Sequence, residues 1–352
     1  MKTRPTGWPF LVAVFAHLAV LPPLLFSQSD FYQGKTITII QGREPGALGD
    51  MRVRAVIPYL QKYIPGNPTI VTEFMPGGGG RKAANHIFRS VRPDGLTLGN
   101  VGAGLIANAV LGEPGVQYDI DKLIYLGSPN SATHYIYLSR ADMGWDSLEK
   151  LRAASGIRIG AQTVGHDIYI NGRLFAWLVG LKDPKFVTGY SGTEVDLALM
   201  RGEVDARAQT AAWLLHRNRD WLDKRLINTH AILDIPKGDK HPHFGLLPEL
   251  ESFARSEKER KIVQMFRAFR LAGSPYVLPP GTPKERVEIL QQAMRKTFKD
   301  PQFEKEFEKL TGDRPTPLMP EAHQRMVKEA PRDPEVIGTF KVVAGAKTLP
   351  AR

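Results

Sequence analysis

Residues 35–63 read KTITIIQGREPGALGDMRVRAVIPYLQKY, and this stretch has the pattern of one strand, one glycine-rich loop and one helix. The run from Lys35 to Ile40 is short and rich in β-branched residues, which favours a strand. Beyond the loop, apolar residues recur at helical spacing, at Val56, Tyr59, Leu60 and Tyr63. The stretch is therefore one β-loop-α unit.

The same unit recurs along the chain. Strand-like runs followed by helix-like runs occur at Thr69 to Glu73 before a helix from Lys82, Leu96 to Val101 before Leu105 to Leu111, Ile157 to Ala161 before His166 to Val179, and Phe186 to Thr188 before Val195 to Arg201. Strands that alternate with helices of this length indicate parallel sheets with crossover helices. The predicted fold class is α/β.

Two regions interrupt the alternation, at residues 118–138 and 229–245. In the first, two strand-like runs follow each other without a helix between them. A chain of 352 residues is long enough for two domains, so we expect it to cross between domains at these places. The predicted division is a first lobe from residues 30–130 and 233–352, including the C-terminal helices, and a second lobe from residues 131–232.

The N-terminus has the order of a secretory signal peptide. Lys2 and Arg4 precede an apolar stretch from Trp8 to Leu21, and small and polar residues follow Pro22-Pro23. We predict a signal peptide over residues 1–29, with cleavage between Ser27 and Asp30. A retained membrane anchor is the alternative, although the two prolines and a run shorter than about 18 apolar residues disfavour it.

Composition excludes several classes of protein. The chain has no cysteine, which excludes disulfides, thiolate nucleophiles, iron-sulfur ligation and a lipid-modified cysteine. Its net charge is +11, a balance that can favour anionic ligands, nucleic acid or membrane surfaces. Segments such as 257–261 and 304–309 mix both signs, so no basic stripe for nucleic acid is formed.

The loop from Gly42 to Asp50 lies between the first strand and its helix. Ligand clefts of open α/β sheets lie outside the carboxyl ends of the strands, where this loop is expected. Its glycines let backbone N–H groups point inward, and Asp50 is placed to cap the helix. The loop lacks the dinucleotide fingerprint and the phosphate-loop motif. The alternative is a tight turn that needs glycine only for its backbone angles.

A second glycine loop, Gly77 to Gly80, also follows a strand and opens a helix. Unpaired N–H donors and the helix dipole favour an anion at such a position. Arg81 and Lys82 place positive charge at this helix start, a local cost that is consistent with an anion-binding role. A flexible loop is the alternative.

Two further turns could close the opposite side of a cleft. They are Gln162 to Asp167 and Tyr190 to Thr193, which supply hydroxyls, an amide and free backbone N–H groups. Serine, threonine and glycine are also common at ordinary turns, so this signal is weak alone.

Taken together, these motifs resemble one known family. The similar stretches, in order, are Phe31 to Ile40, the Pro45-Gly46 loop ending in Asp50, Ile64 to Pro68, Met75 to Gly80 with Ala83-Ala84-Asn85, Pro93-Asp94-Gly95, Tyr190 to Thr193, Gly202 to Asp205 and Pro280 to Pro283. Their order and spacing are similar to those of the Bug-type (TctC-like) substrate-binding receptors of tripartite tricarboxylate transporters.

The resemblance implies a type 2 periplasmic-binding fold, in which two lobes close over a small carboxylate ligand in the periplasm. It also implies transporter membrane subunits as possible partners, and neither cofactor nor metal is expected. By motif match, the implied ligand-binding residues are Pro45, Gly46, Asp50, Gly78, Gly79, Thr163, Gly165, His166, Tyr190 and Gly192.

This chain departs from the family pattern within the first loop. Ala47 and Leu48 stand where the family usually has glycines, and Arg43 and Glu44 stand where it more often has apolar or aromatic residues. Arg43 in the cleft would pair with a carboxylate, whereas Glu44 there would favour a ligand amine.

An exported enzyme acting on a small anionic substrate is the alternative function. His241 and His243 flank Pro242, but no further ligand motif accompanies them, and no Gly-x-Ser-x-Gly elbow is present. His166 is more typical of a cap or a hydrogen-bonding cleft residue than of a general base. We therefore expect a binding protein and not an enzyme.

Overall fold

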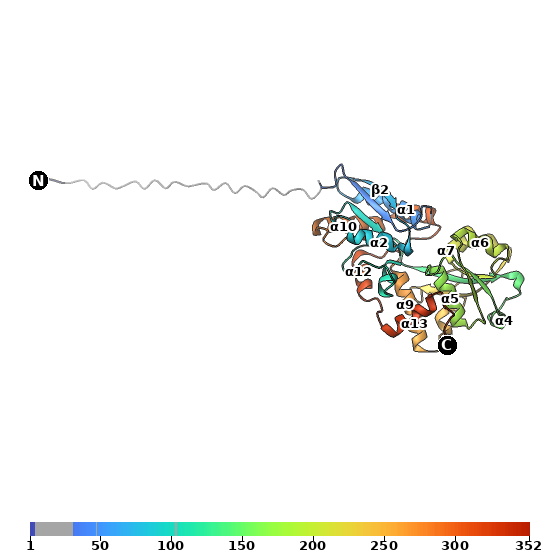
Figure 1. Cartoon of the computed structure of the whole chain (residues 1–352). Coiled ribbons are helices and arrows are strands. Elements are labelled where there is room, and N and C mark those ends of the chain that lie inside the picture. Colours follow the sequence, from blue (N-terminus) through green and yellow to red (C-terminus); the bar gives the residue numbers. More distant parts are fainter. Residues whose placement is uncertain (4–30, 47, 103) are drawn as a thin grey trace.

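The computed structural model describes residues 1–3, 31–46, 48–102 and 104–352. Residues 4–29 of the predicted signal peptide and its cleavage site, like Ala47, therefore lie outside the described residues. Figure 1 shows two lobes side by side, with β2 and α10 in one and α4 and α6 in the other. None of the described helices is long and apolar enough to cross a membrane.

The first lobe is built on a mixed five-stranded sheet. Its strand order is β2 (Thr69–Phe74), β1 (Thr36–Gln41), β3 (Thr97–Asn100), β10 (Tyr276–Leu278) and β4 (Ile124–Gly127). The first three strands run parallel, and β10 runs antiparallel to both of its neighbours. The helices of this lobe are α1 (Leu48–Tyr63), α2 (Arg81–Arg89), α3 (Gly104–Val110), α10 (Lys284–Lys299), α11 (Pro301–Thr311) and α12 (Pro320–Lys328).

The second lobe has its own five-stranded sheet. The order is β7 (Lys185–Val187), β6 (Arg158–Gly160), β8 (Ala206–Thr210), β5 (Thr133–Arg140) and β9 (Ile227–Ile235). Here β6 runs parallel to β7 and β8, whereas β5 is antiparallel to β8 and β9. Around this sheet lie α4 (Leu148–Ala153), α5 (Asp167–Val179), α6 (Gly192–Met200), α7 (Ala211–Arg217), α8 (Arg219–Asp223), α9 (Glu257–Leu271) and α13 (Pro334–Ala344).

The predicted β-loop-α units and the α/β class are confirmed, and each sheet contains antiparallel strands beside the expected parallel ones. Periodicity reports which face of a strand is buried and not the direction in which the strand runs. Strands β4 and β5 are consecutive in sequence and belong to different sheets, as predicted for residues 118–138. The chain returns to the first sheet at residues 272–275, between α9 and β10, which is later than the expected region at 229–245. The predicted boundary at residue 232 differs from this arrangement, because β9 continues in the second sheet to Ile235 and helices α9 and α13 lie around that sheet; the boundary at residue 130 stays a prediction.

The chain crosses between the lobes a third time between α12 and α13, and the first two crossing segments touch each other closely. The Ser128 hydroxyl accepts a hydrogen bond from the Ser274 N–H (2.9 Å) and donates one to the Asn130 carbonyl (2.7 Å). Gly273 has a φ of +65°, and a Cβ on it would lie 1.7 Å from the Asn130 oxygen. Only glycine fits at this point, so the connection between the lobes is compact.

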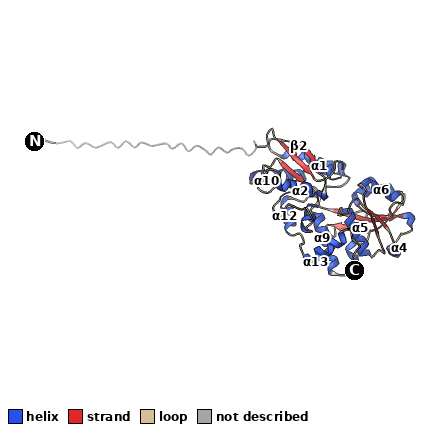
Figure 2. Ribbon diagram, in the orientation of Figure 1, coloured by secondary structure: helices blue, strands red, loops and turns tan. Residues whose placement is uncertain are grey.

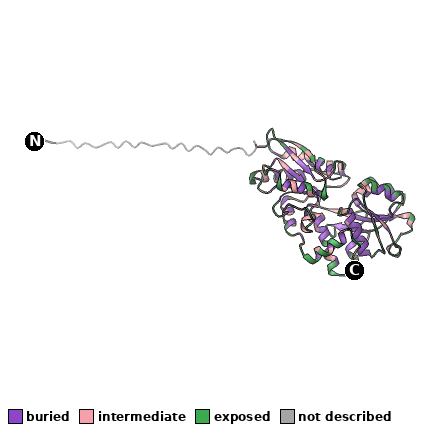
Figure 3. Ribbon diagram, in the orientation of Figure 1, coloured by how far each residue is buried: buried purple, intermediate pink, exposed green. Residues whose placement is uncertain are grey.

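Helix α5 is buried on nearly all of its faces (Figure 3). Helix α13 and the residues after it cover the side that the sheet does not. The buried Arg173 side chain donates to the carbonyls of Val343 (2.5 Å) and Lys347 (2.6 Å), and Trp177 Nε1 donates to that of Pro350 (3.0 Å). The end of the described chain is thus part of the second lobe's packing.

Candidate ligand-binding cleft

A cavity of about 790 Å³ lies between the two lobes. Its wall is formed by loops that follow strands β1, β2 and β3 of the first sheet and strands β6, β7 and β8 of the second, together with residues of α1, α3, α5, α6, α7, α9 and α13. Ligand crevices of open α/β sheets are found at this end of the strands. The cavity is therefore the candidate site.

The loops after β1, β2 and β3 form the first wall of the cavity, which belongs to the first lobe. Glycines allow these three loops to pack closely against one another. A Cβ on Gly42 would lie 3.3 Å from the Gly80 Cα, and one on Gly80, whose φ is +90°, would lie 2.7 Å from Val101 Cγ1. Gly79 lines the cavity beside these contacts, with a φ of +62° that L-residues rarely adopt. The glycine run thus serves both the packing of the loops and the surface of the cleft.

The Asp50 carboxylate shapes the loop and does not face the cavity. It accepts hydrogen bonds from Gln41 Nε2 (2.9 Å) and from the Gly46 N–H (2.9 Å), and Arg54 lies 3.0 Å from it. Burial raises the pKa of this carboxyl group, but these partners outweigh burial and hold the pKa below its usual value. Asp50 therefore stabilises the conformation of the loop without lining the cavity.

Arg43 lines the cavity, whereas Glu44 is exposed and does not line it. The Arg43 guanidinium donates to the side-chain oxygen of Asn100 (2.6 Å) and to the Ser274 hydroxyl (3.3 Å). Burial lowers the pKa of Arg43 to about 10, which leaves it charged at neutral pH. The first loop thus presents a cation to the cleft, anchored to β3 and to the crossing segment.

On the second wall, the N-termini of three helices border the cavity. His166 caps α5, Thr210 caps α7, and Ser191 caps α6 in a capping box with Glu194. Helix N-termini carry partial positive charge, which favours an anion beside them. This wall therefore has the same electrostatic preference as the first.

Asp167 is the one carboxylate among the described lining residues, and its oxygens are engaged. The Tyr135 hydroxyl donates to it (2.7 Å), and Arg270 forms an ion pair with it (3.2 Å). His166 Nδ1 lies 2.9 Å from Asp167, but the same nitrogen lies 3.2 Å from the Ile168 N–H. It donates to Asp167 only when protonated and accepts from Ile168 only when not. Burial raises the pKa of Asp167, but Arg270 and His166 hold it well below its usual value.

Aromatic side chains supply the apolar part of the cleft. The Trp213 indole N–H donates to Asp196 (2.9 Å), which is also paired with the buried Arg207, so the ring orientation is fixed. Further apolar surface comes from Leu48, Met51, Ile168, Phe266, Phe269 and Phe340. The cleft accordingly suits a ligand that has both an anionic group and a hydrocarbon body.

The structure brings most of the predicted site residues together at this cavity. Those that line it are Pro45, Gly46, Gly79, Gly165, His166 and Gly192. The others do not: besides Asp50, they are Gly78 and Thr163, which are exposed, and Tyr190, whose hydroxyl lies 3.4 Å from Glu203. Contact with a ligand stays a prediction for all of them.

Sequence reasoning missed several lining residues. Gln209 and Thr210 end a strand and precede a helix, so the signal that identified the other turns would have found them. Arg52 lies within α1, and Arg270 lies near the end of α9. No local pattern separates these two arginines from solvent-facing ones, because only the tertiary fold brings their helices to the cavity.

His241 and His243 lie close to each other. Among the described residues, no group of three or more histidine, aspartate or glutamate side chains is placed to hold a metal ion. The two rings are 6.4 Å apart, and burial together with His134 lowers the pKa of His241 to about 4.

Comparison with known proteins gives a match in structure and none in sequence. No protein-family model and no curated protein sequence matches the chain. The periplasmic binding protein BugD aligns with a TM-score of 0.64 at 18% identity, covering 89% of this chain and 99% of BugD. MatC from Rhodopseudomonas palustris, with bound malate, aligns at 0.61 and 20% identity, covering 88% and 99%. An adipate-bound protein from R. palustris aligns at 0.62 and 16% identity, covering 88% and 96%. The chain therefore has the two-lobed fold of the Bug-type periplasmic binding proteins.

Proposed function

We propose that this chain is an exported receptor that captures a small carboxylate ligand in the cleft between its lobes. Export is inferred from the residues before Asp30 and implies a periplasmic location. Uptake through transporter membrane subunits, or sensing, would follow capture. Pro45, Gly46, Gly79, Gly165, His166 and Gly192 are proposed to contact the ligand.

The charge of the cleft carries this proposal. Four arginines line the described part of the cavity, at positions 43, 52, 217 and 270, against the one carboxylate of Asp167. Three helix N-termini on the second wall add partial positive charge. A cavity with this balance favours an anion, and apolar surface beside it suits the body of an organic acid. The malate and adipate bound to two proteins of the same fold support the same class of ligand.

A ligand that binds only the folded protein raises its apparent stability in proportion to the logarithm of ligand concentration. Thermal unfolding of the purified protein should therefore shift upward with at least one member of a panel of dicarboxylates, tricarboxylates, amino acids and aromatic acids. We expect the shift among the carboxylates. A panel without any shift, combined with chemical conversion of one of the compounds, would favour the enzyme alternative and end the receptor proposal.

Gly79→Val tests whether the glycine loop belongs to the site. The added side chain enters the cleft wall and should abolish the ligand-induced shift. Gly156→Val is a matched control, because Gly156 has a similar positive φ (+72°) and open space around it but does not line the cavity. Both variants share the backbone strain. Equal ligand shifts in the two variants would remove Gly79 from the site.

A further inference from the structure

Arg52 and Arg270 face the same cavity from different helices, and each has a polar atom without a partner. Arg52 comes from the second turn of α1, and Arg270 comes from α9. The Nε of each is buried and has no hydrogen-bond partner. No hydrogen bond or ion pair joins Arg52 to any other described residue, so its charge has no direct partner within the described protein.

Arg52 is partly buried, and burial of its Nε without a hydrogen-bond partner removes hydration that no described residue replaces. Burial lowers the pKa of Arg52, Asp313 acts against this, and the nearby charge of Arg270 lowers it further. Asp313 does not form an ion pair with Arg52, and burial raises its own pKa. Asp167, the other carboxylate nearby, is already engaged by Arg270. The charge of Arg52 is thus left for a group outside the chain.

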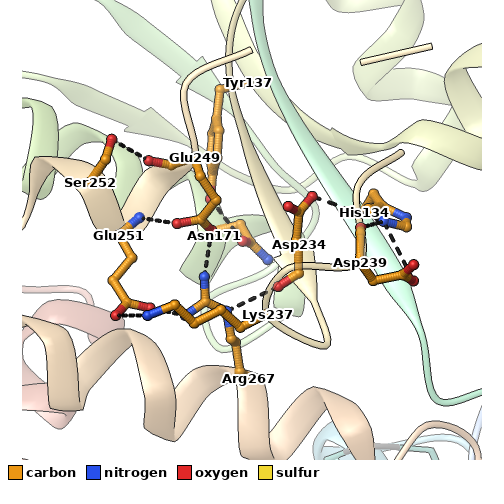
Figure 4. Close-up of polar contacts among 10 residues, drawn as sticks. All are labelled: His134, Tyr137, Asn171, Asp234, Lys237, Asp239, Glu249, Glu251, Ser252 and Arg267. Atoms are coloured by element: carbon orange, nitrogen blue, oxygen red, sulfur yellow. Dashed lines mark hydrogen bonds and ion pairs between the residues drawn. The ribbon is translucent and has the colours of Figure 1, made fainter. Parts of the chain in front are cut away.

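The helix that carries Arg270, α9, is fixed by a polar network around Arg267 (Figure 4). Three residues earlier on α9, Arg267 donates to the Asp234 carbonyl (2.9 Å) and pairs with Glu249 and Glu251. Lys237 also contacts Glu251 (2.7 Å). This network fixes α9 against β9, so Arg270 stands at a defined position above the Tyr135 ring, 5.8 Å from its centre.

We infer that Arg52 and Arg270 form a guanidinium pair that a carboxylate of the ligand bridges, and that this pair makes the cleft select acids with two or more carboxylates over acids with one. This inference rests on the proposed receptor function and concerns which class of carboxylic acid the receptor prefers. The four lining arginines contribute more positive charge than one ligand carboxylate can neutralise. A second carboxylate on the ligand would neutralise more of that charge.

The same arrangement disfavours an amine on the ligand. An ammonium group needs an acceptor, and one oxygen of Asp167, the one carboxylate among the described lining residues, already binds Tyr135 and Arg270. Glu44, which could have supplied a second carboxylate, does not line the cavity. A zwitterionic ligand would therefore place its positive end among guanidinium groups.

Calorimetric titration with three acids tests the pair. Adipate has two carboxylates, hexanoate has a methyl group in place of one, and ε-aminocaproate has an ammonium group. The unmodified protein should bind adipate more tightly than either of the others by on the order of 30-fold. Arg52→Gln should lose most of this preference because its affinity for adipate falls by more than its affinity for hexanoate, and Arg52→Lys should fall between the two.

Two controls remove charge from the same helices outside the cleft. Lys62→Gln on α1 breaks an ion pair with the buried Asp300, and Arg260→Gln on α9 breaks a surface ion pair; both should keep the preference for adipate. The melting temperature without ligand distinguishes a role of Arg52 in ligand selectivity from a role in stabilising the fold. Arg52→Gln should not lower the melting temperature, because Arg52 has no partner to lose. If Arg52 had a structural role, the substitution would lower it. Arg270→Gln should lower it, because Asp167 then loses its cation.

The outcomes distinguish the two proposals. If the unmodified protein binds none of these acids and no carboxylate in the thermal panel, the receptor proposal fails and the pair fails with it. If it binds adipate and Arg52→Gln keeps the full preference over hexanoate, or if ε-aminocaproate binds as tightly as adipate, only the guanidinium pair is overturned.

Discussion

At the scale of single residues, some residues of the cleft could be predicted from the sequence and others could not. Pro45, Gly79 and Gly192 lie in turns between a strand and a helix, so their position in the chain predicts their position in space. Arg52 lies inside a helix, and its approach to the cavity depends on how α1 packs. Gly78 and Gly79 are adjacent and look alike in sequence, yet only Gly79 lines the cavity.

A buried histidine makes the stability of the first lobe depend on pH. The His323 ring is fully buried and lies 4.9 Å from the Tyr125 ring. Burial lowers the pKa of His323 to about 3, against about 6.5 in an unfolded chain. Below about pH 6.5 the unfolded chain therefore binds a proton that the folded protein does not, and the stability contributed by the neutral ring is lost as the pH falls toward 3.

His323→Phe should remove this contribution. The free energy of unfolding should then fall less steeply with acidification between about pH 6.5 and 4, by up to about 1.4 kcal/mol per pH unit. Urea denaturation of both proteins at a series of pH values measures the two slopes. Equal slopes would mean that His323 is protonated in the folded protein.

At the scale of elements, the number and order of the β-loop-α units follow from periodicity, and strand direction does not. Strand β10 is three residues long, and its antiparallel place between β3 and β4 is set by the route that α9 takes back to the first sheet. The packing of the C-terminal residues against α5 could not be predicted from the sequence either. Its apolar residues on all sides indicate complete burial, but they do not say that residues 345–350 provide part of it.

Deletion of residues 346–352 tests the role of that cover. The deletion removes the Lys347 carbonyl from Arg173 and the Pro350 carbonyl from Trp177, and it breaks the ion pair of Arg352 with Glu259 (2.8 Å). Buried donors without acceptors are costly, so we expect a loss of about 2 kcal/mol or more in the free energy of unfolding. Urea denaturation provides the measurement.

Trp177→Phe is the milder comparison for this deletion. It removes only the donor of one hydrogen bond and should cost less than the deletion does. A deleted protein as stable as the full chain would show that the final residues do not contribute to the packing of α5.

At the scale of the whole molecule, the two lobes are joined by segments that are short and in contact with each other. Besides the pairing of Ser128 with Ser274, the Thr316 hydroxyl accepts hydrogen bonds from the N–H groups of Ser131 and Ala132, each at 2.9 Å. A compact connection of this kind suits rotation of one lobe against the other about a hinge. The cavity on one side of it would then narrow around a ligand.

The absence of cysteine makes this closure directly measurable. Cysteines introduced at Glu73 on β2 and Lys185 on β7, both exposed and on the edge strands of the two sheets, give one labelling site in each lobe. Pulsed electron resonance between spin labels at these sites reports the distance between the lobes. The account predicts that malate or adipate shifts the distance distribution to a new and narrower population, and that Gly79→Val abolishes the shift. A distribution unchanged at saturating concentrations of both acids would contradict capture of a carboxylate between the lobes.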